Sequence, residues 1–228
     1  MSSDPNASPI NPLPPIVVAL AVFLVGVELV FQAGENGLAG GPGAVGWRLA
    51  AMEKWSFFEP LFDWMVSNRI FRWDYAVRFV TYPFIHGNLT HLLFVLVFLL
   101  ALGKMVGELF SALAVLVIFF GSAILGALVY GFVWDTRVPL IGGYPAVYGL
   151  IGAYSFLLWV QLAGTDQNRL LAFRLIAFLM GIQLVFSLFN WGSLNWVADI
   201  SGFVAGFFLS FLVAPGGFRR ALELVRRR

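Results

Sequence analysis

Four side chains that could take part in chemistry lie within or beside strongly apolar segments: Glu28, His91, Tyr144 and Asp199. Hydrolysis would need a nucleophile, a base that activates it and donors for the developing oxyanion. Tyr144 is a poor nucleophile because an unperturbed phenol titrates near about 10, and Asp199 is too weak a base to activate it. We therefore interpret the pairing of Tyr144 with Asp199 as structural.

A metal centre is the second chemistry to consider. His91 and Asp199 could form a pair of ligands, but the sequence has no third carboxylate, His or Cys close by, and it contains no Cys at all. We therefore predict no metal site and no cofactor. His86 precedes the same apolar segment as His91, where an interfacial hydrogen-bonding role is the simplest interpretation.

Small residues recur every four positions in two apolar segments. Such strips let neighbouring membrane helices approach closely. We expect the two helices to pack backbone to backbone, and the functional site to lie where their outer ends meet, near Tyr144 and Asp199. The strips consist of Gly149 and Ala153 in one segment, and of Ala198, Gly202, Gly206 and Ser210 in the other.

The composition is that of an integral membrane protein. Hydrophobic residues make up 60% of the 228 residues and charged residues 11%, with a mean hydropathy of +0.87. A soluble domain carries about 25% charged residues. Without a basic surface carrying interleaved aromatics, we expect no nucleic-acid partner. Six segments are long enough to cross a bilayer, which predicts an all-α polytopic protein: 15–33, 89–107, 110–133, 145–163, 170–189 and 196–214.

The remaining segments predict the domain organisation and the topology. Residues 1–14 are expected to be a disordered lead, 15–214 the transmembrane domain, and 215–228 a basic tail. Region 34–88 mixes Trp, Phe and charge, which is typical of short amphipathic helices at the interface. Lys104, Arg169 and the Arg-rich tail fall on one side, which the positive-inside tendency makes cytoplasmic. We expect both termini there, in a bacterial inner membrane, with 34–88 outside.

Three local motifs resemble those of the rhomboid intramembrane serine proteases. The segment Phe84-Ile85-His86 with His91 is similar to the family's Phe-x-His and second His opening span two. Residues 146–153 resemble the helix after the family's Gly-x-Ser-Gly, and 198–206 resemble its Ala-His-x-x-Gly-x-x-x-Gly. The long first loop with Trp47-Arg48 also fits. The resemblance covers about residues 47–212 and implies the six-helix rhomboid-like bundle.

The same alignment departs from the family at the residues that do the chemistry. Tyr144 stands where the family has its nucleophilic Ser, and Asp199 stands where it has its general-base His. His91 matches the oxyanion-side His, but Val95 replaces the Asn expected four residues later. Glu108 sits one position after the family's acid in span two. The resemblance therefore predicts a pseudoprotease with no catalytic residues.

Three functions follow from these observations. The first is a catalytically inactive membrane protein that binds transmembrane partners, as an adaptor, a chaperone or an accessory subunit, with lipids as its other partners. The second is an active protease with an unorthodox site. The third is a proton or small-solute pathway through Glu28, His91 and Asp199, although the sequence shows no broken helix at the midplane. No partner for Glu28 is evident, and Glu108 is expected at the interface beside Lys104.

Overall fold

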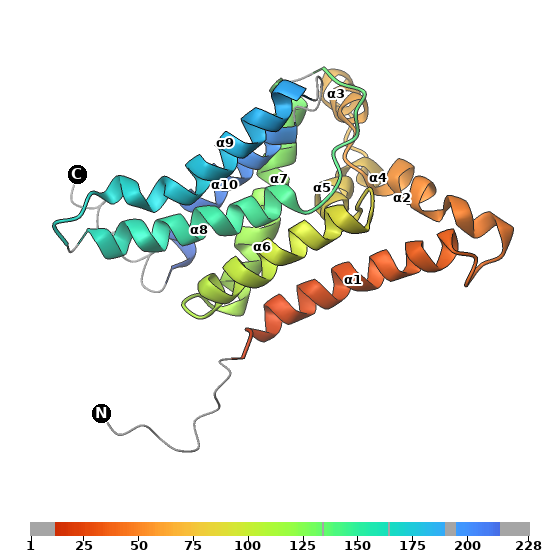
Figure 1. Cartoon of the computed structure of the whole chain (residues 1–228). Coiled ribbons are helices and arrows are strands. Elements are labelled where there is room, and N and C mark those ends of the chain that lie inside the picture. The colour runs from red at the N-terminus through yellow and green to blue at the C-terminus, as the bar shows by residue number, and fades with distance from the viewer. Residues whose placement is uncertain (1–11, 134, 164, 190–194, 215–228) are drawn as a thin grey trace, which may run out of the picture.

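The computed structural model describes residues 12–133, 135–163, 165–189 and 195–214. Most of the expected N-terminal lead and the whole basic tail lie outside the described residues. The described chain is a bundle of long helices with a series of short helices at one end (Figure 1). Its long helices are α1 (Pro15–Glu35), α6 (Leu89–Gly107), α7 (Ala112–Val133), α8 (Tyr144–Leu162), α9 (Arg174–Phe189) and α10 (Asn195–Val213).

Five of these helices, all except α9, are long and apolar enough to cross a membrane. The all-α polytopic architecture is therefore confirmed, and five of the six predicted spans meet this criterion within the described residues. The segment predicted as 170–189 opens with a 3₁₀ turn, η3 (Arg169–Phe173), which leaves 16 residues of α-helix. The residues that follow α9, 190–194, lie outside the described part of the chain.

Helix α8 lies at the centre of the bundle, because its residues are buried from Pro145 to Ala153 without interruption. Its packing against α10 depends on missing side chains. A Cβ on Gly206 would lie only 2.0 Å from the carbonyl oxygen of Gly149. A Cβ on Gly202 would lie 2.2 Å from the carbonyl oxygen of Pro145. The two backbones are therefore in direct contact along the strips of small residues.

Region 34–88 folds into short helices. A turn after α1 contains Gly37, Gly40 and Gly41, all with positive φ, and it reverses the chain toward the bundle. An isolated antiparallel bridge between Phe57 and Leu140 ties this region to the loop that precedes α8. The elements are η1 (Pro42–Gly46), α2 (Trp47–Trp55), α3 (Glu59–Asn68), α4 (Trp73–Ala76), α5 (Arg78–Thr81) and η2 (Tyr82–Phe84).

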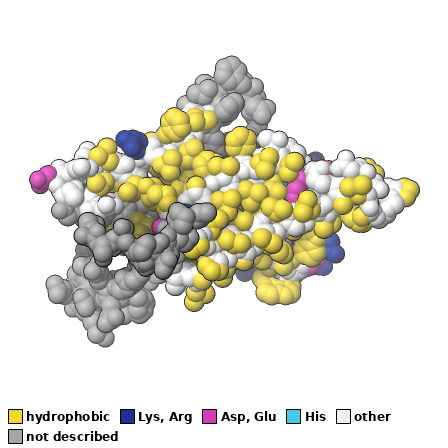
Figure 2. Space-filling view, turned by 60° about the horizontal axis from the view of Figure 1, so that its bottom comes forward, with side chains coloured by type: hydrophobic (Ala, Val, Ile, Leu, Met, Phe, Trp, Pro, Cys, Tyr) yellow, Lys and Arg dark blue, Asp and Glu magenta, His cyan; other side chains and the backbone are white. Residues whose placement is uncertain are grey.

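The surface of the long helices is apolar. Figure 2 shows hydrophobic side chains over most of the visible face, and the few charged ones lie mostly toward its two ends. Large apolar side chains are exposed on the helices themselves, including Val22 and Phe23 on α1, Val97 on α6 and Leu113 on α7. A contiguous apolar surface of this kind is suited to lipid and not to water. The protein is an integral membrane protein.

Candidate degenerate active site

A pocket of about 290 Å³ lies at the end of the bundle where α8 and α10 begin. It brings His91, Tyr144 and Asp199 together, although these residues lie far apart in the sequence. The structure therefore places three of the four side chains that could do chemistry in one site. The remaining lining residues are Thr90, Phe94, Leu140, Ile141, Pro145 and Asn195.

Local structure fixes the position of His91. The side chain of Asn88 caps α6 by accepting a 2.8 Å hydrogen bond from the backbone N–H of His91, as an N-cap residue is expected to do. On the other side, Gly142 has φ +88° and its backbone N–H donates to the carbonyl of Tyr82 at 3.0 Å. A Cβ on Gly142 would collide with the imidazole of His91, so a glycine is required there.

Tyr144 fills the space beside this imidazole. The rings of Tyr144 and His91 are stacked, with centroids 5.0 Å apart and an interplanar angle of 18°. This stack of two aromatic rings holds the phenol against the imidazole.

Two further positions that depart from the family pattern are buried. Asp199 is 2% exposed and Val95 is fully buried. A Cβ on Gly143 would lie 2.8 Å from a methyl group of Val95, so this side chain packs against the turn that precedes α8. The described part of the chain contains no group of three His, Cys, Asp or Glu side chains placed to hold a metal ion.

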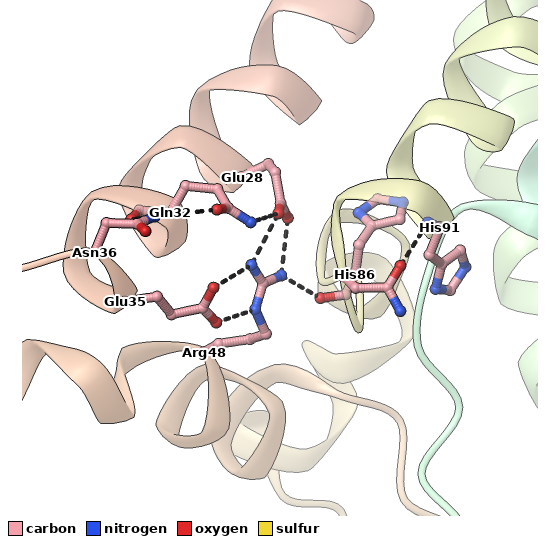
Figure 3. Close-up of polar contacts among 8 residues, drawn as sticks. Glu28, Gln32, Glu35, Asn36, Arg48, His86 and His91 are labelled. Atoms are coloured by element: carbon pink, nitrogen blue, oxygen red, sulfur yellow. Dashed lines mark hydrogen bonds and ion pairs between the residues drawn. The ribbon is translucent and has the colours of Figure 1, made fainter.

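A buried ionic cluster lies next to the site, and sequence reasoning missed it. Figure 3 shows Arg48 on α2 pointing between two carboxylates of α1. Its guanidinium donates to both oxygens of Glu28 at 2.9 and 2.8 Å. It also donates to both oxygens of Glu35 at 2.6 and 3.2 Å. These bonds raise the pKa of Arg48, so its guanidinium stays charged.

The cluster connects the short helices to the residues that line the pocket. A further bond runs from Arg48 to the backbone carbonyl of His86 at 2.7 Å. The ring of His86 then contacts the ring of His91 edge-on, with centroids 5.0 Å apart. His86 is 1% exposed, so its ring is enclosed by protein. Burial, and next the neighbouring His91, lower the pKa of His86 to about 4, so this ring is neutral near pH 7.

The only sequence signal for this cluster was an acid within a span, Glu28, and an arginine in the following segment. An intramembrane acid implies a partner, but the chain offers several arginines and spacing alone does not select Arg48. The structure thereby removes one premise of the pathway hypothesis, since Glu28 is held in an ion pair with Arg48.

The fold and site define a polytopic helical membrane protein with a pocket between the first turns of three long helices. The rhomboid domain matches residues 74–216, which is more than half of the chain, and the chain belongs to the rhomboid family. A protein of Bacillus subtilis (strain 168), YdcA, provisionally named a rhomboid protease, is 28% identical over 149 residues. That alignment covers 63% of this chain and 70% of YdcA.

Proposed function

We propose that this chain is a catalytically inactive rhomboid protein that binds transmembrane partners. The observation that carries the proposal is the stacking of the Tyr144 ring on the His91 ring. The phenol occupies the position of the family's nucleophile, and its ring lies flat on the imidazole that would help to hold the oxyanion. A substrate carbonyl would have to enter the same space.

The general base is absent as well. Asp199 takes the place of the family's His and lines the pocket. Loss of one triad member can leave about 10³–10⁴-fold catalysis over water, but that remainder depends on an intact oxyanion hole and on binding. With Val95 in place of an amide, one oxyanion donor is missing too. Three separate losses support a binding role better than a catalytic one.

The proposed partner is a transmembrane helix of another protein. We propose a bacterial inner membrane as the location, with both termini cytoplasmic and the pocket at the outer side. The exposed apolar faces of α6 and α7 would then be available to a transmembrane segment of a client or of a larger assembly. In this role the rhomboid fold acts as an adaptor, a chaperone or an accessory subunit.

Cross-linking in native membranes followed by purification in mild detergent tests the binding role. We expect a specific transmembrane protein to co-purify, compared with an unrelated polytopic protein treated in the same way. The double variant Tyr144→Ser with Asp199→His should retain that partner, because binding does not use a catalytic dyad. Absence of any specific partner, or a partner that appears only in the double variant, would contradict the proposal.

An active protease is the second candidate, favoured by the name of YdcA, which describes a protease. It would need a nucleophile other than Tyr144. Ser155 is fully buried and the hydroxyl of Ser201 donates to the carbonyl of Val197 at 2.7 Å. Labelling with a serine-reactive fluorophosphonate separates the two candidates: we expect no labelled serine, and a labelled one would favour the protease.

A further inference from the structure

We propose that the pocket between α6, α8 and α10 binds a cationic side chain, a Lys ammonium or an Arg guanidinium, that a transmembrane partner presents. The inference rests on the proposed function and specifies one chemical feature of the partner. It would place a positive charge against Asp199, at the position where an active member of the family carries its general base.

Two of the polar side chains of the pocket present oxygen acceptors, Asp199 and Asn195. Asp199 is the acidic side chain among the described residues that line the pocket, and it lies within a span. The amide oxygen of Asn195 is buried and has no hydrogen-bond partner within the described chain. No Lys or Arg is present among the described residues that line the pocket. Whatever else Asp199 contacts, the sign of the charge favours a cation that can donate hydrogen bonds.

The aromatic ring of Tyr144 in the pocket lining also favours a cationic side chain. Tyr144 lines the pocket beside Asp199, and the negative face of an aromatic ring attracts an ammonium or a guanidinium group. Ligand pockets for drug-sized molecules have volumes of about 300–1,000 Å³. At about 290 Å³ this pocket is at the small end of that range and is matched to a single side chain.

The rim of the pocket indicates where the cation comes from. Thr90 and Phe94 form part of the lining and are exposed on the surface of α6. Phe94 is 55% exposed and lies one turn further into the span than Thr90. A partner helix lying along α6 could therefore extend a long Lys or Arg stem sideways into the pocket, with its own backbone remaining in lipid.

A lipid amine is less well matched to this geometry. Headgroups lie beyond the ends of the spans, whereas Asp199 lies more than one turn inside α10. An intramembrane cation on a partner, in turn, is costly unless it meets an opposite charge. We therefore assign the site to a partner side chain, and a lipid headgroup becomes an outcome that the experiment can report.

Binding of two matched single-span peptides to the whole protein in phosphatidylcholine nanodiscs tests this assignment. One Leu/Ala-rich peptide carries a Lys in the second turn from its outer end, and the other carries Met at that position. The chain contains no Cys, so a single Leu93→Cys substitution on exposed α6 allows energy transfer to a labelled peptide. We expect the Lys peptide to bind at least about tenfold more tightly.

Two variants test whether the preference for the Lys peptide over the Met peptide depends on the pocket. Asp199→Asn should reduce the preference for Lys to less than about twofold, because it removes the charge with little change in shape. Asp63→Asn, on exposed α3 outside the pocket, should leave it unchanged. The wild-type comparison of Lys with Met needs no variant, so a folding defect of Asp199→Asn does not remove the test.

Equal binding of the two peptides overturns the cation site and leaves the proposed function standing, because the helix is still recognised. A failure of both peptides to bind overturns the inference, and the co-purification experiment then decides separately about the function. If phosphatidylethanolamine in the nanodisc abolishes the preference for Lys, the occupant is the headgroup and the assignment to a partner is wrong.

Discussion

Replacement of Arg48 by Met should destabilise the protein more than any other single change outside the helix core. Arg48 is 7% exposed and its guanidinium makes five hydrogen bonds, to Glu28, Glu35 and the carbonyl of His86. Met has a similar length and keeps the apolar contacts of the stem, so the change isolates the charge.

The expected magnitude follows from what the removal leaves behind. The Glu28 side chain is 2% exposed, so its carboxylate would stay buried without a cation. Breaking a buried pair in this way costs about 3–5 kcal/mol. The Glu35 side chain is 34% exposed and can be hydrated instead, which limits its share to about 0–1 kcal/mol. We therefore expect Arg48→Met to lower the free energy of unfolding by roughly 3–5 kcal/mol.

Equilibrium unfolding in mixed micelles, followed by the fluorescence of the eight Trp residues, measures this loss. The double variant Arg48→Met with Glu28→Gln should recover part of it, with a coupling of about 1–3 kcal/mol, because no charge is then left buried. Arg72→Met, which removes an exposed ion pair with Asp74, serves as the control and should have little effect. A loss below about 1 kcal/mol for Arg48→Met, or a double variant no more stable than the single one, would refute the reasoning.

Two further predictions concern packing and pH. Gly206→Ala should destabilise the protein by about 1–3 kcal/mol, because its Cβ would meet the backbone of α8 at 2.0 Å, whereas Gly181→Ala, with nothing within 4 Å, should not. Thermal unfolding of both variants checks this, and equal effects would count against direct backbone contact. The folded-state pKa of His86 is about 4, below its unfolded value near 6.5. Its contribution to stability is therefore present above about pH 6.5 and is lost as the pH falls toward 4, at up to about 1.4 kcal/mol per pH unit. His86→Asn should remove this part of the pH dependence, and an unchanged slope would contradict the burial of a neutral ring.

Much of the architecture could be predicted from the sequence because its signals are local. Long apolar runs indicate spans wherever they occur, and three motifs with family spacing implied that His91, Tyr144 and Asp199 converge. The apolar composition of segment 170–189 does not reveal that its first residues form a 3₁₀ turn. Hydropathy measures composition and is insensitive to the helix type.

The ionic cluster could not be predicted, because it depends on how the chain turns after α1. Glu28 and Arg48 are brought together by a reversal through glycines with positive φ, and no pattern within either segment encodes that path. The stacking of Tyr144 on His91 is a second case. The stack depends on the position of the imidazole, which is held between Asn88 and Gly142, and no pattern around Tyr144 encodes that position.

The proposed absence of catalysis is tested most directly by proteolysis in a reconstituted membrane. The purified wild-type chain is incorporated into liposomes with a fluorogenic transmembrane substrate that an active rhomboid protease cleaves in the same preparation. We predict no cleavage above that of empty liposomes. Cleavage that persists through purification and disappears after one substitution in this chain would contradict the assignment of Tyr144 and Asp199 to a degenerate site.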